Sequence, residues 1–473
     1  MKNNVKKFIY YISIVLCFTC LISSIFLQAT YYHFDPINVK DNIKLITSDE
    51  YEGRLTGSNG NYRMSSTIED SFKKSKLTPL KNTYRESFEI TTPVKNNTTP
   101  QLTIKNDSTI LHDYKYGVDF KEDMINFRTP NVTFTNKDKI DIFESSFIIQ
   151  NDNKNYLFYV SFDKNFKFRS SFNSKSKYEF SVAITTDVYN SMLDSLRDGN
   201  KVTINLPYAL KSSETSNIIG ILKGTSDTLP PLVISAHFDH LGIDALGNHY
   251  NGALDNASGT AFMLELSKSL SSFVKPNRDI IFVALTGEEF GLLGSKIFAK
   301  EYLDTIKGGK IINFDMIGAA NTPISLITGS IFKDKEDETN SELLDSLKNI
   351  CSNKGVNYTV KFEDSSDHAS FTDLGIDSVT LCHSDLSKIH TPQDTVDYID
   401  TAAIANVYSV VQEEIYDYAY NDFILLFYSP KLAIFFFIVT IFLIVFPTIK
   451  YKIKNQIIVI IKSNFPLISL RKK

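Results

Sequence analysis

The sequence predicts an α/β protein with a mixed, largely parallel central sheet flanked by helices. From residue 215 onward, compact apolar segments alternate with segments whose apolar residues recur at helical spacing. Strands buried on both faces form continuous apolar runs, and their alternation with helices favours a parallel sheet. The expected strands are SNIIGILKG, PLVISAHFD, RDIIFVALTG, GKIINFDMIG and DSVTLCH, and the expected helices are GTAFMLELSKSLSSF, GLLGSKIFAKEY and ETNSELLDSLKNICSNKG.

Upstream of this region, the pattern changes between residues 84 and 208. Short alternating runs such as SFEIT, LTIKN, VTFTN and FYVSF are typical of strands separated by polar turns. We interpret this stretch as an inserted β-rich domain. Residues 38–80 precede it and are expected to be mostly helical, because the apolar positions of IEDSFKKSKL recur at helical spacing.

Length and composition indicate a globular protein of more than one domain. The chain has 473 residues, of which 43% are hydrophobic and 22% are charged, so it can bury a large core. A net charge of only −4 gives no electrostatic reason to expect nucleic acid as a partner. Four cysteines do not make a disulfide framework, although Cys351 and Cys382 could pair. The composition indicates no oligomeric state.

Each end of the chain carries a candidate membrane-spanning helix. Residues 8–29 and 432–449 are apolar runs long enough to cross a lipid bilayer. Lysines precede the first run, as they do in a secretory signal, but its length and the lack of a clear cleavage site favour a retained anchor. Lysines also follow the second run, and cationic flanks stay in the cytoplasm. We therefore expect a cell-membrane protein with both termini cytoplasmic and residues 30–430 outside.

Ionisable residues lie directly behind several predicted strands of the α/β region. The carboxyl ends of parallel strands meet at one edge of a sheet, so these side chains are expected to converge. One more acidic residue opens a helix, and one histidine lies on a late loop. The candidate site residues are His237, Asp239, Asp255, Glu288, Glu289, Asp315 and His390.

Several carboxylates in one cleft repel one another unless a cation compensates their charge. Imidazole together with carboxylate is a donor set that suits zinc, whereas an all-oxygen set suits magnesium or calcium. Two metal ions need a bridging ligand, and the short carboxylate of Asp255 can serve. Asp239 is expected to accept the second N–H of the His237 imidazole and to fix the ring. Taken singly, each residue has a structural interpretation; Asp255, for example, could be only a helix N-cap.

The motifs that contain these residues resemble, in order, those of the bacterial leucyl aminopeptidase family and of aminopeptidase Y-like enzymes, the co-catalytic zinc exopeptidases of clan MH. The resemblance covers residues 40–420 apart from the insertion, whose closing stretch DVYNSMLDSLRDGNKVTINL resembles a protease-associated domain. The matching motifs are EGRLTGSNGN (52–61), AHFDHLG (236–242), GALDNASGTA (252–261), TGEEFGLLGS (286–295), INFDMIG (312–318), SDHASF (366–371) and IHTPQDT (389–395).

This resemblance implies a zinc-peptidase fold and a metallo-aminopeptidase that hydrolyses the N-terminal residue from peptides with two Zn²⁺ ions. His237 and Asp315 would bind one ion and Glu289 and His390 the other, with Asp255 shared by both. Glu288 would be the general base. His240, His368 and Asp394 lie in matching motifs and are expected to support the loops, and no oxyanion-stabilising residue is assigned.

The resemblance leaves three alternatives open. Glutaminyl cyclases share most of these ligands but use one zinc ion, and carboxypeptidases of the same fold need a basic pocket for the substrate carboxylate. A non-catalytic receptor-type ectodomain is the third. The predicted organisation is a cytoplasmic stub and anchor at 1–29, the first part of the catalytic domain at 30–82, the inserted domain at 83–210, the zinc-peptidase core at 211–425, a transmembrane helix at 430–449 and a basic cytoplasmic tail at 450–473.

Overall fold

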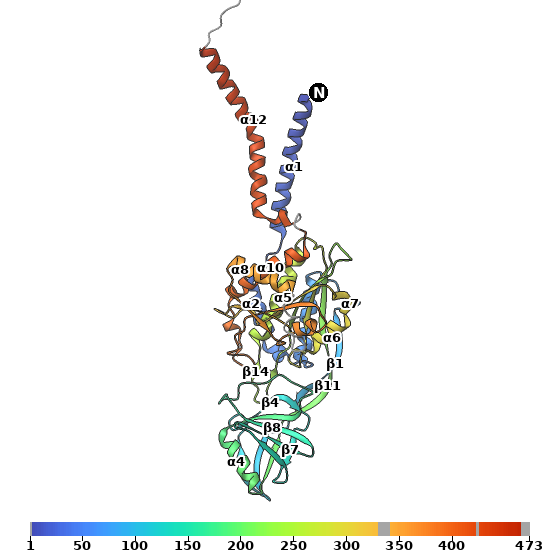
Figure 1. Ribbon diagram of the computed structural model, residues 1–473, viewed down its shortest axis with the longest axis vertical. Coiled ribbons are helices and arrows are strands. Elements are labelled where there is room, and N and C mark those ends of the chain that lie inside the picture. Colours follow the sequence, from blue (N-terminus) through green and yellow to red (C-terminus); the bar gives the residue numbers. More distant parts are fainter. Residues whose placement is uncertain (1, 330–340, 422–424, 465–473) are drawn as a thin grey trace, which may run out of the picture. The chain divides into compact units, whose positions relative to one another are not determined.

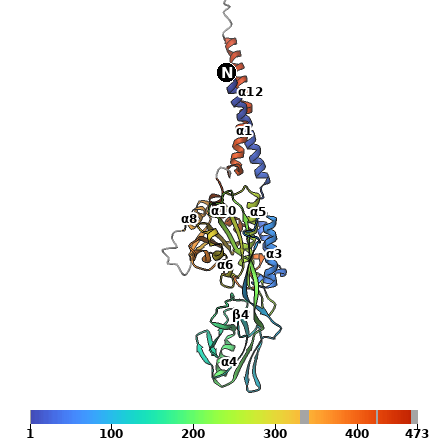
Figure 2. The same ribbon diagram turned by 90° about the vertical axis from the view of Figure 1, so that its right-hand side faces the viewer.

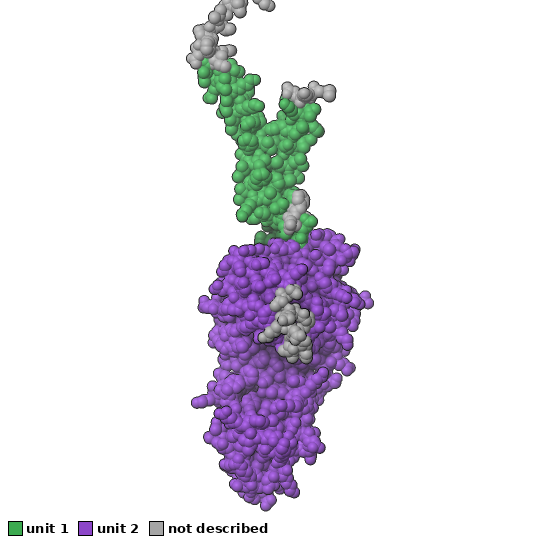
Figure 3. All heavy atoms as spheres, viewed as in Figure 1, with its two compact units in different colours: residues 1–33, 272–274, 420–473 green, residues 34–271, 275–419 purple. Residues whose placement is uncertain are grey.

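The computed structural model describes residues 2–329, 341–421 and 425–464. It divides into two compact units, which Figure 3 distinguishes by colour. Unit 2 comprises residues 34–271 and 275–419 and holds the predicted α/β region together with the inserted segment. Unit 1 comprises residues 1–33, 272–274 and 420–473. The first residues of one expected helix, 338–340, and the end of the basic tail, 465–473, lie outside the described residues.

A mixed sheet with the strand order β1-β11-β15-β12-β16-β19-β17-β18 forms the core of unit 2 (Figure 1). Its inner strands β15, β12, β16 and β19 are parallel, as their apolar sequences predict. On one side β11 and β1 continue the sheet antiparallel, and on the other β17 is antiparallel to β19 and parallel to β18. The strands are β1 Arg85–Lys95, β11 Tyr208–Leu222, β12 Leu232–His237, β15 Ile280–Leu285, β16 Lys310–Asp315, β17 Ile324–Thr328, β18 Tyr358–Phe362 and β19 Asp377–Cys382.

Helices cover both faces of this sheet (Figure 2). On one face Ile281 belongs to a hydrophobic cluster with Phe298 of α6 and Phe371 of α9. The next residue, Phe282, points to the opposite face, where its ring centroid lies 6.3 Å from that of Phe72 in α3. The helices of this unit include α3 Asn59–Lys74, α5 Gly259–Ser272, α6 Leu293–Glu301, α7 Leu303–Ile306, α8 Glu342–Lys354, α9 His368–Thr372 and α10 Thr401–Ala419.

The segment before the sheet folds as the helix α2, the 3₁₀ turn η1 and the helix α3. Their bounds are α2 Pro36–Ile46 and η1 Asp49–Arg54. Gly53 in η1 has a φ of +63°, and a Cβ there would lie 2.6 Å from the carbonyl oxygen atoms of Gly242 and Tyr250. Only glycine fits between these carbonyls, so the EGR motif is fixed against the loop that follows β12.

The inserted segment forms two further sheets. One has the order β4-β9-β8-β7-β6, and the other has the order β3-β2-β10-β5. Strand β1, which the sequence analysis places in the insertion, pairs along its length with β11 in the central sheet instead. The elements are β2 Gln101–Asn106, β3 Thr109–Tyr114, β4 Phe120–Phe127, β5 Asn131–Phe134, β6 Lys139–Ile142, β7 Ser146–Asn151, β8 Lys154–Val160, β9 Tyr178–Ile184, α4 Thr186–Arg197 and β10 Lys201–Asn205.

Aromatic side chains dominate the core of the inserted segment. Phe120, Phe158 and Phe180 are buried in one cluster, which accounts for part of the high phenylalanine content. The same cluster includes two residues of the α/β region, Tyr250 in the short strand β14 and Phe290 in the turn after β15. The two parts of unit 2 therefore share one hydrophobic core. That the insertion is a protease-associated type of domain stays a prediction.

Unit 1 contains two long helices, α1 Lys2–Thr30 and α12 Pro430–Asn464. Within the described residues these two are long and apolar enough to cross a membrane, and both are largely exposed. They contact each other, because the Tyr10 hydroxyl of α1 donates to the Leu443 carbonyl of α12. The Ser24 hydroxyl of α1 donates at 2.6 Å to the Phe427 carbonyl in the 3₁₀ turn η5 Leu426–Tyr428, which precedes α12. The described part of the basic tail continues α12 beyond Pro447.

The cysteines of the chain are all free. Cys351 and Cys382, whose pairing the sequence left open, are buried thiols. The fold of unit 2 therefore depends on its hydrophobic core and on buried polar contacts.

Candidate metal centre

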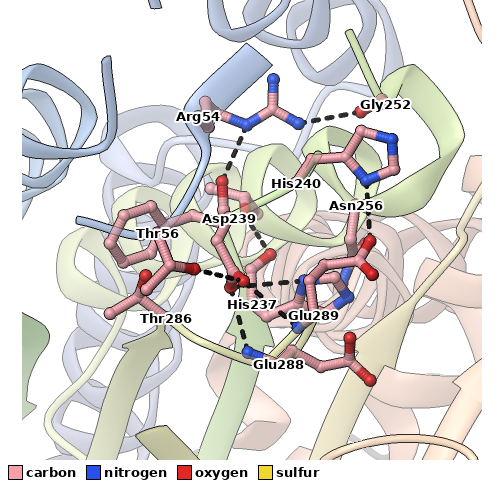
Figure 4. Close-up of polar contacts among 12 residues, drawn as sticks. Arg54, Thr56, His237, Asp239, His240, Gly252, Asn256, Thr286, Glu288 and Glu289 are labelled. Atoms are coloured by element: carbon pink, nitrogen blue, oxygen red, sulfur yellow. Dashed lines mark hydrogen bonds and ion pairs between the residues drawn. The ribbon is translucent and has the colours of Figure 1, made fainter. Parts of the chain in front are cut away.

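The candidate residues meet at the carboxyl edge of the parallel strands. β12 ends at His237, which is in register with Leu285, the last residue of β15. The neighbouring strand β16 ends at Asp315. Parallel pairing therefore brings three strand ends to one edge, and the turn after β15 adds Glu288 and Glu289 (Figure 4).

The first group consists of His237, Asp255 and Asp315, whose ligand atoms lie within 4.8 Å of one another. Nε2 of His237 is 3.5 Å from Oδ1 of Asp255 and 3.5 Å from Oδ1 of Asp315. All three residues are buried. One imidazole nitrogen and two carboxylate oxygens thus point into a common space.

The second group shares Asp255 with the first. Nε2 of His390 lies 3.3 Å from Oδ2 of Asp255 and 3.3 Å from Oε1 of Glu289. His240 also belongs here, because its ligand atom lies within 4.8 Å of those of Asp255 and Glu289. The two oxygens of Asp255 therefore face different imidazoles, Oδ1 toward His237 and Oδ2 toward His390.

The electrostatics of both groups fit a bound cation. Burial alone lowers the pKa of His237, but the charges of Glu288 and Asp315 raise it well above its usual value. The pKa of His390 is raised in the same way, against its burial, by Glu289 and Asp255. Oδ1 of Asp315 is buried without a hydrogen-bond partner among the described residues. Nitrogen and oxygen donors in this combination are those that zinc prefers.

The two adjacent glutamates have opposite pKa shifts. Burial raises the pKa of Glu288 well above its usual value; the His237 charge opposes this shift and the neighbouring Glu289 carboxylate adds to it. Burial also disfavours the charged form of Glu289, but His390 and a hydrogen bond from His240 lower its pKa well below the usual value. Two carboxylates with separated pKa values can divide the roles of proton carrier and charged ligand.

Asp239 organises the turn that carries both glutamates. Its Oδ1 accepts a hydrogen bond from the backbone N–H of Glu288 at 3.3 Å, and its Oδ2 accepts one from that of Glu289 at 3.2 Å. The Thr56 hydroxyl donates to the same Oδ2 at 2.8 Å. The distance from Oδ1 to Nδ1 of His237 is 3.7 Å, which exceeds a hydrogen bond. The expected role of Asp239 in orienting the imidazole stays a prediction.

The turn that carries Asp255 is held from two sides. The carboxylate of Asp394 accepts the backbone N–H groups of Leu254 at 2.8 Å and of Asp255 at 3.0 Å. The side chain of Asn256 donates to the Phe314 carbonyl at 2.8 Å and so joins this turn to the end of β16. The turn includes η2 Ala253–Ser258, and the small β13 Gly242–Ile243 and β14 His249–Tyr250 strands precede it.

Arg54 connects the loops behind the metal groups. It is fully buried, and its guanidinium donates to the carbonyls of Phe238 at 2.7 Å, Asn251 at 2.8 Å, Gly252 at 3.0 Å and Ile46 at 3.1 Å. Burial lowers its pKa to about 10, although nearby carboxylates oppose the shift. Figure 4 shows the contact of this side chain with Gly252; together with the bond to Phe238 it joins the loop after β12 to the turn that carries Asp255.

Two further histidines support the framework in their neutral form. His368 bonds the Thr380 hydroxyl through Nδ1 and the Glu363 carbonyl through Nε2, each at 2.8 Å. Nδ1 of His383 accepts the backbone N–H of Gly318 at 2.9 Å. Burial lowers the pKa of both imidazoles to about 4. The supporting role expected for His368 agrees with these contacts.

The sequence predicts that the seven candidate residues converge, and the structure brings them together. Most of the residues that hold them in place were not predicted. Arg54 lies in the EGRLTGSNGN motif but was given no role, although a charged residue inside a matching motif can indicate a function. Asn256 was given no role either. Ser171 was also missed; its hydroxyl donates to Oε2 of Glu289 from within the inserted segment. No motif surrounds Ser171, so the sequence offers no signal for it.

The chain is similar to known proteins over the region that carries this site. The profile of Peptidase family M28 matches residues 217–415. Aminopeptidase YwaD of Bacillus subtilis (strain 168) is 27% identical over 234 residues, which are 47% of this chain and 49% of that protein. A glutamate carboxypeptidase 2 homolog of Caenorhabditis briggsae is 30% identical over 124 residues, 25% of this chain and 15% of that protein. The chain thus spans about half or less of the length of these relatives.

A solved structure shares the fold. BSAP, a zinc aminopeptidase from Bacillus subtilis, superposes with a TM-score of 0.58 at 18% sequence identity. The alignment covers 82% of this chain and 96% of that protein. The mixed sheet with its flanking helices is therefore the zinc-peptidase fold.

We predict that replacing Arg54 by alanine destabilises unit 2 by about 3–5 kcal/mol, because it leaves several buried carbonyls without a donor. Arg54→Lys should cost less, since an ammonium retains part of these contacts. Chemical unfolding and zinc content measure the effect. Arg63→Ala, which removes an exposed ion pair with Glu52 in the same segment, is the control and should cost less than about 1 kcal/mol. Equal losses in Arg54→Ala and Arg63→Ala would contradict the role of Arg54.

A second prediction concerns acid. The folded-state pKa of His383 is about 4, below its unfolded value of 6.5, so the unfolded state binds the extra proton first. The stability contributed by neutral His383 is therefore complete above about pH 6.5 and is lost as the pH falls toward 4, by about 3 kcal/mol in total. In His383→Asn an amide replaces the titrating group, so unfolding measured between about pH 7 and pH 4 should show a smaller loss. Identical pH profiles of unfolding for the unaltered chain and His383→Asn would refute the role of His383.

Proposed function

We propose that this chain is a membrane-anchored aminopeptidase that uses two zinc ions, and the match of the Peptidase family M28 profile to residues 217–415 supports this assignment. The observation that carries the proposal is the shared carboxylate of Asp255, which faces one imidazole in each group. A bridging carboxylate between two nitrogen-containing ligand sets is what a pair of metal ions requires.

In this proposal His237 and Asp315 would hold one ion, Glu289 and His390 would hold the other, and Asp255 would be shared by both. Bound zinc ions supply Lewis-acid chemistry, which polarises a peptide carbonyl and lowers the pKa of a water molecule. His240 keeps Glu289 in place, because its Nδ1 lies 2.9 Å from Oε1 of that carboxylate.

Glu288 is the proposed general base. It lies next to the ligand Glu289 and is only partly covered, so a substrate can reach it. Burial raises the pKa of its carboxyl group, which strengthens it as a base toward water and lets it return the proton to the leaving amine. The acidic residues of the edge favour a substrate with a positively charged amino terminus, and this supports cleavage of the first peptide bond.

Two alternatives from the same fold are less well supported. A glutaminyl cyclase would use one metal ion, whereas the described residues offer two groups of possible ligands that share Asp255. A carboxypeptidase needs a basic group for the substrate carboxylate. The nearby guanidinium groups of Arg54 and Arg169 are instead bonded to main-chain carbonyls. A receptor-type ectodomain would have no need for the buried carboxylates and Glu288.

The two apolar helices of unit 1 support membrane anchoring. Their lengths match a bilayer, and lysines lie before the first apolar run and after the second. We place both termini in the cytoplasm and the peptidase outside. An anchored extracytoplasmic enzyme would act on peptides at the membrane surface.

The function is tested on the purified full chain in detergent. Aminoacyl-nitroanilides should be hydrolysed, a chelator should abolish turnover, and zinc should restore it at two ions per chain. Cyclisation of N-terminal glutaminyl peptides or hydrolysis of acidic dipeptides, without aminoacyl turnover, would assign the chain to one of the alternatives. Absence of any turnover by the zinc-loaded protein would reject the proposal that the chain is an enzyme.

In the same assay Glu288→Gln should retain zinc and lose turnover by about 10²–10⁴-fold, because the base is removed without altering the ligands. Glu301→Gln is the matched control, since Glu301 is an exposed glutamate on α6 that pairs with Lys81. Near-normal hydrolysis by zinc-loaded Glu288→Gln would eliminate this residue as the base.

Membrane topology is tested by labelling. Cysteines placed at Lys137, an exposed residue of the inserted segment, and at Lys452 beyond the apolar run should differ in reactivity. Lys137→Cys should react with an impermeant thiol reagent on intact cells, and Lys452→Cys only after permeabilisation, because the bilayer separates them. Labelling of both in intact cells would exclude the proposed orientation.

A further inference from the structure

A segment of the insertion reaches the second metal group. Residues 166–172, here called the strap, lie between β8 and β9, outside the motifs of the α/β region. The backbone N–H of Arg169 donates to the His390 carbonyl at 3.0 Å, and that of Phe172 donates to the Glu289 carbonyl at 2.9 Å. The strap thus bonds the main chain of both residues that would bind the second metal ion.

The strap also contacts the side chain of Glu289. The Ser171 hydroxyl donates to Oε2 of this carboxylate at 2.5 Å. The other oxygen, Oε1, lies 2.9 Å from Nδ1 of His240 and 3.3 Å from Nε2 of His390. Ser171 therefore donates to Oε2 of Glu289, while Oε1 of the same carboxylate faces the other members of the second group.

His390 has a particular need for support. Its φ is +57°, an uncommon conformation for a residue with a side chain. The strap holds its carbonyl through Arg169, and the ring of Phe168 stacks on the imidazole with a centroid distance of 5.9 Å. A loop in this conformation keeps its geometry only where its surroundings fix it.

Buried charges fix the strap itself. The Arg169 side chain is 1% exposed, and its guanidinium donates to the Leu241 carbonyl at 2.6 Å and to the Tyr208 hydroxyl at 3.1 Å. The ammonium of Lys121, 1% exposed, donates to the Phe166 carbonyl at 2.9 Å and pairs with Asp244 at 2.7 Å. Both cations come from the inserted segment and bind the loop that follows β12.

From these contacts we propose that the inserted segment completes the second metal site, with Ser171 as a positioning residue for Glu289. The proposal rests on the proposed two-zinc function and deepens it. The Ser171 hydroxyl fixes the rotation of the carboxylate, so that Oε1 is presented to the ion before the ion arrives. Hydrogen-bond partners of metal ligands typically change metal affinity by about 10–100-fold when they are removed.

The test compares three variants of the full chain in detergent. Ser171→Ala removes the hydroxyl, Ser171→Thr keeps a hydroxyl at this partly exposed position, and Ser170→Ala is the matched control. The Ser170 hydroxyl donates to Asp123, away from the metal groups, at 2.8 Å. Zinc affinity is measured by chelator competition, and the absorption of the cobalt-substituted protein reports the ligand geometry.

We expect Ser171→Ala to lower the affinity for one of the two zinc ions by about 10–100-fold and to change the absorption spectrum of the cobalt-substituted protein. Ser171→Thr should restore both, and Ser170→Ala should leave both as in the unaltered chain. Unchanged zinc affinity in Ser171→Ala overturns the proposal, as does an equal loss in Ser170→Ala. Because affinity is measured without substrate, a chain that binds two zinc ions but hydrolyses no peptide would reject the proposed function and leave this inference standing.

Discussion

The crowding of carboxylates at one edge of a parallel sheet is the constraint on which the rest of this structure depends. Asp255, Glu288, Glu289 and Asp315 lie together in a largely buried space, and their repulsion must be compensated. The imidazoles of His237 and His390 hold protons strongly for this reason. A pair of divalent cations would provide the same compensation and would release those protons.

Such a site requires loops that keep their positions although several carboxylates repel one another between them. Each loop is tied by a buried polar side chain: Arg54 bonds carbonyls of two of them, Asp239 accepts the N–H groups of the glutamate turn, and Asp394 accepts those of the Asp255 turn. These groups carry no proposed chemistry. They exchange hydrogen bonds with the main chain, and this places the metal ligands within a few ångströms of one another.

The inserted segment belongs to this framework. Its aromatic core is continuous with Tyr250 and Phe290, and its cations Lys121 and Arg169 bind the loop after β12. The strap therefore brings a rigid, buried scaffold up to Glu289. Such a framework would couple the geometry of the proposed metal site to a part of the chain that has no catalytic motif.

The sequence by itself determined the α/β class, the apolar helices at both ends and the convergence of the ionisable residues that directly follow the strands, because periodicity and parallel pairing are local rules that a linear pattern can show. It also indicated that the long N-terminal motif mattered, but not that Arg54 would be buried behind the site. Only the tertiary structure decided that β1 joins the central sheet, that the two oxygens of Asp255 face different histidines, and that Ser171 reaches Glu289. Apart from the contact between His237 and Asp255, these contacts join residues more than a hundred positions apart. No local pattern encodes such a pairing, since it depends on how loops pack in three dimensions.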